Sequence, residues 1–347
     1  MSATGTHDDL FQRLTTSALE FLRRAMAEAE ANPKFALVHF CAGLELILKA
    51  RLLREHWSLV VTSKPDLRKF QSGDFESVSL STSIERLASV LDDPLPKDAQ
   101  AAFEKIARHR NRVVHFVHDM DDATKTKLKE SIAAEICLGW FFLSQLLQHW
   151  SSYFRASKLE IVKIDIGMRK VRTYLEVSFA RMKPQLDAAR ASGRAVAVCP
   201  SCGFEAAITN QKERALHWQS CKVCGYNMNL VDYVCGEDDC GISHRFSSFH
   251  AFQPINCACG HLISQEDLRK SLDDGPLDDR ETRINCGECG AENTVVRHGE
   301  TFLCVECFYD EGEIGTCDWC GERQVGGSLL DSYDDGCVCC HGAKDRD

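Results

Sequence analysis

Apolar residues recur at three- and four-residue spacing through the first 155 residues, where glycine and proline are scarce. This spacing places the apolar side chains on one face of a helix and predicts an all-α region. We expect helices at residues 10–31, 35–57, 83–91, 98–118 and 123–154, with breaks at Asn32-Pro33 and Asp93-Pro94. Four of them are long, so residues 1–157 are predicted to form a helical bundle.

Residues 158–195 follow the bundle as a strand and a connecting helix. The stretch LEIVKIDI at residues 159–166 is rich in β-branched residues and predicts the strand. Residues 169–191 predict the helix, which we expect to be kinked at Pro184. Its apolar seam consists of Val171, Leu175, Phe179, Met182, Leu186 and Ala189. The seam is expected to dock either on the bundle or on a second copy of it.

From residue 196 onward the pattern changes to short β-prone pieces separated by cysteines, glycines and acidic loops. Apolar residues are too sparse here to predict a large shared core, so we expect small modules held together by metal. The expected modules are residues 196–230, 231–265, 283–310 and 314–343. The predicted fold class is therefore multidomain, with an N-terminal all-α bundle and a C-terminal array of small β-rich zinc-ribbon modules.

Cysteine is the outlier in composition, because 17 of the 19 cysteines lie from Cys199 onward. The first residues, MSATGTHDDLFQRL, have acidic groups where an export signal has basic groups and an apolar run, which predicts a cytoplasmic protein. In a reducing compartment this density favours metal ligation over disulfides. The apolar stretch at residues 136–147 covers about 12 residues, against roughly 20 for a bilayer span, so no membrane partner is expected.

Sixteen of these cysteines form eight close pairs, and consecutive pairs predict four sites, here named clusters 1 to 4. Cluster 1 is Cys199, Cys202, Cys221 and Cys224; cluster 2 is Cys235, Cys240, Cys257 and Cys259; cluster 3 is Cys286, Cys289, Cys304 and Cys307; cluster 4 is Cys317, Cys320, Cys337 and Cys340. The loops within clusters 1, 3 and 4 have zinc-ribbon lengths. In cluster 2 the two cysteine pairs have unusual spacings, Cys-x4-Cys and Cys-x-Cys, and His261 is an alternative ligand there. In cluster 4, Cys339 or His341 competes with Cys340.

The expected cofactor is zinc, with about four structural ions per chain. Four thiolates close the coordination sphere and leave no open position, so these sites are predicted to be structural and no metal is expected in catalysis. Iron in a rubredoxin-like centre is the rival metal, and the number of sites favours zinc.

The charge of this region limits the kinds of partner that it can bind. Residues 196–347 contain 12 Lys and Arg against 27 Asp and Glu. A zinc ion with four thiolates adds further negative charge. This balance argues against broad phosphate binding, although the first module alone could still manage it through Lys212, Arg214, His217, Trp218 and Lys222. We expect the acidic region to bind a protein, to sense a ligand or to cover a basic site of the bundle.

The stretch RHRNRVVHF at residues 108–116 is either the charged flank of an ordinary helix or the catalytic part of an enzyme. On a helical wheel the core stripe consists of Phe103, Ile106, Val113, Val114 and Val117, and Arg110 falls inside it. Burying an unpaired guanidinium costs several kcal/mol, so a partner is needed. Glu45 lies in the middle of the apolar face of the second helix and predicts a partly buried pair with Arg110. Such a pair either fixes the bundle register or holds Arg110 in a cleft.

Asn111 and His115 are four residues apart, so they share the flank beside this stripe, with Arg108 nearby. Arginine, asparagine and histidine without a carboxylate cluster suit metal-free cleavage of RNA. Histidine exchanges protons with the 2′-hydroxyl or the leaving 5′-oxygen, and arginine stabilises charge on the phosphoryl oxygens.

The segment Arg110-Asn111-Arg112-Val113-Val114-His115 resembles the Arg-x4-6-His motif of HEPN-domain ribonucleases. The preceding helix, AGLELILKARLL with Glu45 and Lys49, is also similar to the second helix of that family, and the resemblance covers about residues 8–155. The chain departs from the family in two ways: it has no nucleotidyltransferase partner segment, and four zinc ribbons are not a family-wide feature.

The resemblance implies a homodimer in which two motifs face each other in one cleft that cleaves RNA without metal, typically in toxins and antiviral defence proteins. Carried over by position, the catalytic set is Arg110, Asn111 and His115, with Glu45 holding Arg110. Weaker candidates for RNA contact are Arg108, His109, Arg112 and His118. The alternative is a non-catalytic dimeric scaffold whose zinc ribbons bind a protein or nucleic-acid partner.

Overall fold

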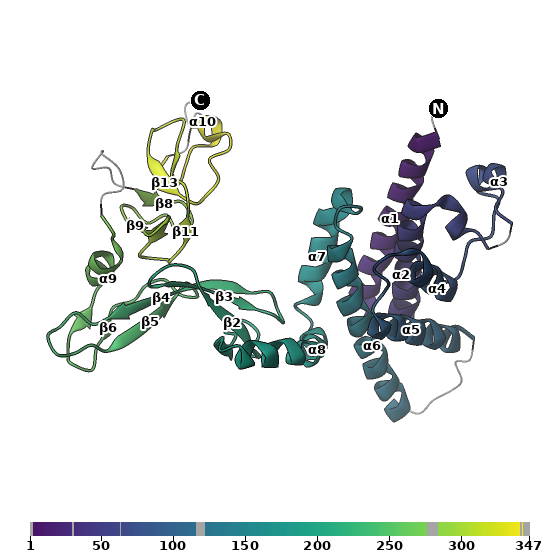
Figure 1. Ribbon diagram of the computed structural model, residues 1–347, viewed down its shortest axis with the longest axis horizontal. Helices are drawn as coiled ribbons and strands as arrows, with labels where there is room; N and C mark the ends of the chain where they lie inside the picture. Colours follow the sequence, from purple (N-terminus) through teal and green to yellow (C-terminus); the bar gives the residue numbers. More distant parts are fainter. Residues whose placement is uncertain are drawn as a thin grey trace. The chain divides into compact units, whose positions relative to one another are not determined.

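The computed structural model describes residues 3–29, 31–62, 64–115, 122–275, 284–340 and 342. His118 and His341, both named above, lie outside these residues. The chain divides into two compact units, Met1–Arg181 and Met182–Asp347, here called the helical unit and the β-rich unit. Figure 1 labels their elements. The division falls inside one helix and confirms the coarse expectation of an α-helical part followed by a part rich in strands and cysteines.

The helical unit contains the five predicted helices with shifted ends. Its elements are α1 (Ala3–Glu28), α2 (Pro33–Glu55), η1 (Trp57–Val60), α3 (Leu67–Ser72), α4 (Leu80–Val90), α5 (Lys97–His115), α6 (Asp122–His149), η2 (Arg155–Ser157), α7 (Lys158–Met168) and the first half of α8 (Arg172–Ala191). Helices α1 and α2 lie side by side, and α2 also contacts α4, α5 and α6. The core between them contains Phe11, Phe40, Phe103 and Trp140, each no more than 1% exposed.

The strand predicted at residues 159–166 is wrong, because these residues form helix α7. Ile164 and Met168, four residues apart, are buried, which is the spacing of a helix face. Asp165 accepts hydrogen bonds from Trp140 Nε1 on α6 at 3.1 Å and from Arg169 Nε at 2.6 Å. Packing against the bundle therefore overrides the local β propensity. The connecting helix is present as α8, and it continues past Pro184 to Ala191.

Within the described residues, the part of α6 at Lys127–His149 is the one segment whose length and composition would let it cross a membrane. Of its most apolar window, 67% is buried inside the protein. That burial is also what a core helix of a bundle shows.

The β-rich unit is built on a five-stranded antiparallel sheet in the order β1-β2-β3-β4-β5. Its elements after α8 are β1 (Val196–Val198), β2 (Glu205–Gln211), β3 (Leu216–Cys221), β4 (Asn227–Val234), β5 (Ser243–Ser247), β6 (Ile255–Asn256), β7 (Leu262–Ile263), α9 (Gln265–Leu272), β8 (Asn285–Cys286), β9 (Val295–His298), β10 (Thr301–Cys304), β11 (Asp310–Glu311), β12 (Gly315–Thr316), β13 (Arg323–Val325) and α10 (Ser332–Asp335). Strand β4 crosses the module boundary expected at residue 230, so clusters 1 and 2 share one sheet.

The expectation that this half lacks a shared core is also wrong. One apolar cluster joins β3 and β4 to α9 and β10, through residues such as Val231, Leu268 and Leu303, each fully buried. A smaller cluster around Val325 joins β8, β10 and β13. Strand β13 pairs with β8 in parallel, with Val325 opposite Cys286. These residues come from segments far apart in the sequence, so local apolar density did not reveal them.

Candidate functional site

Helix α5 carries the motif residues and leaves the core as it approaches them. Phe103 and Ile106 are buried as predicted, and His109 is the next fully buried position. Val113 is only half-buried, and the prediction that Val114 belongs to the core is wrong, because its side chain is 51% exposed. The buried stripe therefore ends near His109, and the last turn of α5 lies at the edge of the unit.

His109 is buried in an ion pair and is unsuited to the RNA contact expected of it. It is 6% exposed, and its Nδ1 lies 2.7 Å from Oε2 of Glu135 on α6, itself 7% exposed. Glu135 also pairs with Lys105, at 3.2 Å. Sequence reasoning missed Glu135, although an acid inside the apolar face of α6 is the same signal that singled out Glu45.

The predicted ion pair between Glu45 and Arg110 is wrong. Glu45 pairs with Lys49 one turn later on α2, at 2.5 Å, and the buried Lys49 ammonium also donates to Ser77 Oγ at 2.8 Å. Arg110 is half-buried and hydrogen bonds to the thiol of Cys41. The spacing of four residues from Glu45 to Lys49 gives a closer and more strongly preferred partner than a second helix does.

The pKa of the Cys41 thiol is influenced by both Arg110 and Glu45. Burial raises the pKa of its thiol, the Arg110 hydrogen bond and charge act in the opposite direction, and the charge of Glu45 adds to the rise. The net effect is a raised pKa, so Cys41 stays a neutral thiol near pH 7. Among the described residues, no carboxylate forms an ion pair with Arg110.

The other motif residues face outward where the structure describes them. Asn111 and Arg112 are exposed, and Arg108 is 66% exposed with a 3.6 Å ion pair to Glu104. The backbone of His115 ends α5, and its side chain lies outside the described part, as does all of His118. The last turns of α5 thus combine exposed polar groups with one half-buried guanidinium.

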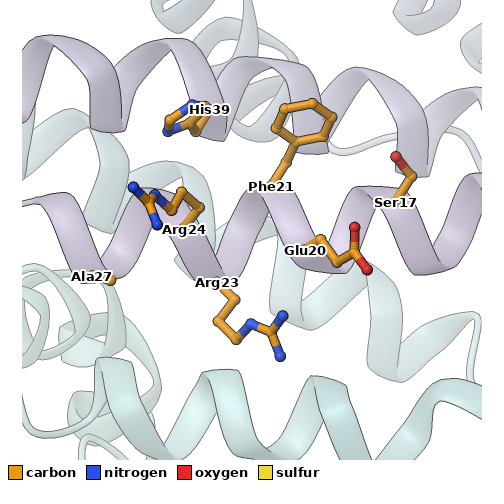
Figure 2. A pocket seen from close by; sticks show the side chains of 7 residues that line it. All are labelled: Ser17, Glu20, Phe21, Arg23, Arg24, Ala27 and His39. Carbon is orange, nitrogen blue, oxygen red and sulfur yellow. The ribbon is translucent and has the colours of Figure 1, made fainter.

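A polar hollow of about 570 Å³ lies on a different surface of the helical unit, along α1 and α2 (Figure 2). Its lining consists of Ser17, Glu20, Phe21, Arg23, Arg24, Ala27 and His39. Beside it, Glu28 accepts hydrogen bonds from Arg24 at 2.7 Å and contacts His39 Nδ1 at 2.8 Å. Burial acts to raise the pKa of Glu28, but these two contacts outweigh it and lower that pKa. None of the motif residues lines this hollow.

The sixteen predicted cysteines come together in four groups, and the groups are clusters 1 to 4 as expected. None of the 19 cysteines, all of which are among the described residues, is in a disulfide. The nearest sulfur atoms within each cluster lie 3.6–3.9 Å apart. A tetrahedral ion with Zn–S bonds of about 2.3 Å requires a separation of about 3.8 Å. The donor set and its geometry therefore fit about four metal ions and are compatible with zinc.

Tight turns shape these clusters. In each of the four clusters a glycine with positive φ follows the second cysteine of a pair, and its amide donates to the carbonyl of the first. Gly203, for example, has φ 77° and donates to Cys199 O at 2.9 Å. Phe308 makes the same turn after Cys307 with φ 58°. These turns let backbone amides point at the sulfurs, which suits a bound cation.

Position decides between the ligand candidates that the structure describes, which do not include His341. His261 lies 2.9 Å from Glu237 and 3.4 Å from Asp267, outside the thiol group of cluster 2. Cys340 rather than Cys339 completes cluster 4. The Cys339 thiol instead accepts a hydrogen bond from Asn285 Nδ2 at 3.0 Å.

One cysteine in each cluster has a lowered pKa: Cys224, Cys257, Cys304 and Cys340. The largest cause is a neighbouring thiol for Cys224 and Cys304, and a backbone amide for Cys257 and Cys340, in each case donating to the sulfur. A lowered thiol pKa favours the deprotonated form that binds a cation.

Three of the basic groups that made the first module an alternative phosphate site are already paired. Lys212 binds Asp310 at 2.5 Å, Arg214 binds Asp274 at 3.0 Å, and His217 lies 2.9 Å from Asp232. These acids neutralise the charges that a phosphate would need.

No protein-family model, no curated protein and no solved structure matches this chain.

Proposed function

We propose that the helical unit is a metal-independent endoribonuclease of the HEPN type, acting as a toxin or antiviral defence effector. The observation that carries the proposal is the last part of α5, where the half-buried Arg110 adjoins the exposed Asn111 and Arg112. Arg110 adjoins the neutral thiol of Cys41, and no carboxylate in the described part of the chain pairs with it, which leaves its charge for an anionic substrate.

In the proposed reaction the imidazole of His115 removes the proton of a ribose 2′-hydroxyl. The 2′-oxygen attacks the adjacent phosphorus, and the bond to the 5′-oxygen breaks as that oxygen receives a proton from a protonated histidine imidazole of the motif. The products are a 2′,3′-cyclic phosphate and a 5′-hydroxyl. Arg110 stabilises the negative charge that grows on the phosphoryl oxygens, and Asn111 orients the phosphate. Arg108 and Arg112, both exposed, bind the flanking backbone.

The proposed active form is a homodimer, because each chain supplies a single motif, with Arg110 at its start and one histidine, His115, at its end. The exposed Val114 lies beside the motif and offers an apolar contact that a second copy would cover.

The test is incubation of the purified protein with total RNA in the presence of EDTA. We expect cleavage by the wild type and a loss of at least about 100-fold in His115→Ala and Arg110→Ala, the scale of a missing general base or charge-stabilising group. Arg13→Ala is the matched control, because Arg13 is an exposed arginine of the same unit that pairs with Asp9 one turn away. Cleavage that requires added metal, or that survives His115→Ala, contradicts the mechanism. Sequencing of RNA ends after expression in cells then identifies the substrate.

The second candidate is a dimeric scaffold without catalysis. It is favoured by the structural contacts of the motif region, since His109 pairs with Glu135 and Arg110 bonds to Cys41. A protein that is dimeric by light scattering and that cleaves no RNA under any condition supports this candidate.

We further propose that clusters 1 to 4 bind zinc as structural ions and that the acidic β-rich unit recruits a protein partner or regulates the nuclease. The fit of the sulfur separations to a tetrahedral ion supports the metal. Elemental analysis should give about four zinc ions per chain. A red protein with iron in place of zinc contradicts this assignment.

A further inference from the structure

His244 lies against cluster 2 but belongs to none of the predicted ligand sets. It is half-buried on β5, opposite Tyr233 of β4, and its Nε2 is 3.2 Å from Sγ of Cys257. The backbone pairing of these strands continues to Cys235, whose amide donates to Ile242 O at 2.9 Å. The sheet that carries Cys235 therefore also fixes the position of the imidazole.

The distance suits two kinds of contact with a metal thiolate. At 3.2 Å a protonated Nε2 donates a hydrogen bond to the Cys257 sulfur. A tetrahedral zinc with Zn–N of about 2.0 Å and Zn–S of about 2.3 Å separates ring nitrogen from sulfur by about 3.5 Å. Nε2 thus lies within a few tenths of an ångström of the separation from Cys257 that a ligand would have.

Cys259 is the weakest-held thiol of this cluster. It is exposed, whereas Cys235 and Cys257 are buried, and one residue separates it from Cys257. Its sulfur is 3.8 Å from that of Cys235. Because Cys259 is exposed and only one residue separates it from Cys257, solvent and electrophiles reach its thiol first.

Cluster 3 offers a natural comparison. There Thr294 Oγ1 lies 3.2 Å from Sγ of Cys304, the same separation as in cluster 2. A neutral hydroxyl is not among the nitrogen, thiolate and carboxylate ligands that zinc takes from proteins, whereas a neutral imidazole is a common one. Cluster 3 also has an exposed thiol, Cys289, but no imidazole beside the group among the described residues.

We propose that His244 is a reserve ligand of cluster 2, which holds zinc through four thiolates or, when Cys259 is lost, through three thiolates and His244. This inference rests on the zinc part of the proposed function. In the exchange the bond from zinc to the Cys259 sulfur breaks and a bond to Nε2 forms. Nε2 releases its proton to solvent, and Nδ1 takes one up, so the ring stays neutral.

The experiment measures zinc per chain in the full-length protein after dialysis against a weak chelator. Cys259→Ser is expected to keep the wild-type count, and so is His244→Ala. The double variant Cys259→Ser/His244→Ala is expected to lose one ion. Cys289→Ser is the matched control and is expected to lose one ion by itself, because cluster 3 has no reserve ligand.

A second measurement does not depend on the folding of the double variant. Cobalt-substituted Cys259→Ser should have a weaker thiolate-to-metal absorption band than the wild type, and d–d bands shifted toward those of a site with three sulfurs and one nitrogen. A loss of one ion from Cys259→Ser, or cobalt spectra that show no nitrogen ligand, overturns the reserve role. A wild-type protein that lacks zinc in cluster 2 overturns the zinc assignment itself, which separates the two failures.

Discussion

Cys137 lies on α6 in apolar surroundings, with a side chain that is 4% exposed. Burial raises the pKa of its thiol from 9.0 to about 12. The folded chain therefore keeps a proton that the unfolded chain releases above pH 9. The stabilisation linked to this thiol is fully present below pH 9 and is lost as the pH rises toward 12, by about 1.4 kcal/mol per pH unit.

We predict that Cys137→Ala flattens this alkaline loss. Between pH 9 and pH 11 the free energy of unfolding of the wild type should fall by about 2 kcal/mol more than that of the variant. Urea unfolding followed by the helical circular dichroism signal measures it. Ile136→Val, which trims an equally buried neighbour without a titratable group, should keep the wild-type slope. Equal slopes for Cys137→Ala and wild type would show that the thiol ionises as freely in the folded chain.

At the level of single residues, the sequence identified the cysteine ligands better than the motif contacts. Cysteine pairs are local and specific, so all sixteen cysteines were assigned to the groups in which the structure brings them together. The partner of Arg110 was predicted wrongly. A helical wheel gives the direction of a side chain but does not show which of several neighbours it contacts. Cys41 lies one turn before Glu45 on the same face of α2, and it is the Cys41 thiol that hydrogen bonds to Arg110.

At the level of elements, the contact between α5 and α6 depends on Glu135. Removing one partner of a buried hydrogen bond leaves the other partner unsatisfied, at a cost of about 1–3 kcal/mol. We predict a loss of this size for Glu135→Ala in urea unfolding and a smaller one for Glu135→Gln, which can still bond to His109. If Glu135→Ala costs under about 1 kcal/mol, the pair does not hold the two helices together.

The close approach of α6 to α2 and α5 depends on Gly139. A Cβ atom there would lie 2.6 Å from both Ile106 Cδ1 and Phe40 Cε1. Alanine normally favours a helix over glycine by about 1 kcal/mol, but the overlap outweighs this gain, so Gly139→Ala should destabilise by about 1–2 kcal/mol. Gly167→Ala is the matched control, because its Cβ would meet only Met26 Cε at 3.6 Å. It should be neutral or stabilising in thermal unfolding, and the same sign for both variants contradicts the argument.

Helices of the bundle could be predicted because their apolar repeat is long. Helix α7 could not, because its eleven residues contain a β-prone run whose helical form is decided by Asp165 and Ile164 packing against α6 and the rest of the bundle.

At the level of the whole molecule, removal of metal should affect the two units differently. A strong chelator should abolish the β-rich unit's structure, since its clusters hold the turns between short strands, while the helical unit keeps its own apolar core. Circular dichroism should retain the helical signal, and limited proteolysis should leave a fragment ending near residue 181. If the β-rich unit resists proteolysis without metal, its shared apolar core alone is sufficient.

The change from a helical part to a part rich in strands was predictable from the residue pattern, which changes near residue 196. The connections inside the β-rich unit were not predictable. The shared core and the continuous sheet depend on pairings between strands separated by tens of residues. Each strand is too short to predict its partner.

The parallel pairing of β8 with β13 has a consequence for biosynthesis. At about 5–20 residues per second, a ribosome needs several seconds to reach β13 after completing β8. During that interval the nascent chain exposes the unpaired edge of Asn285 and Cys286, even though the other thiols of cluster 3 are made well before β13. A chain that stops before Arg323 lacks the strand that pairs with Asn285 and Cys286, so a single missing strand leaves this edge without its partner.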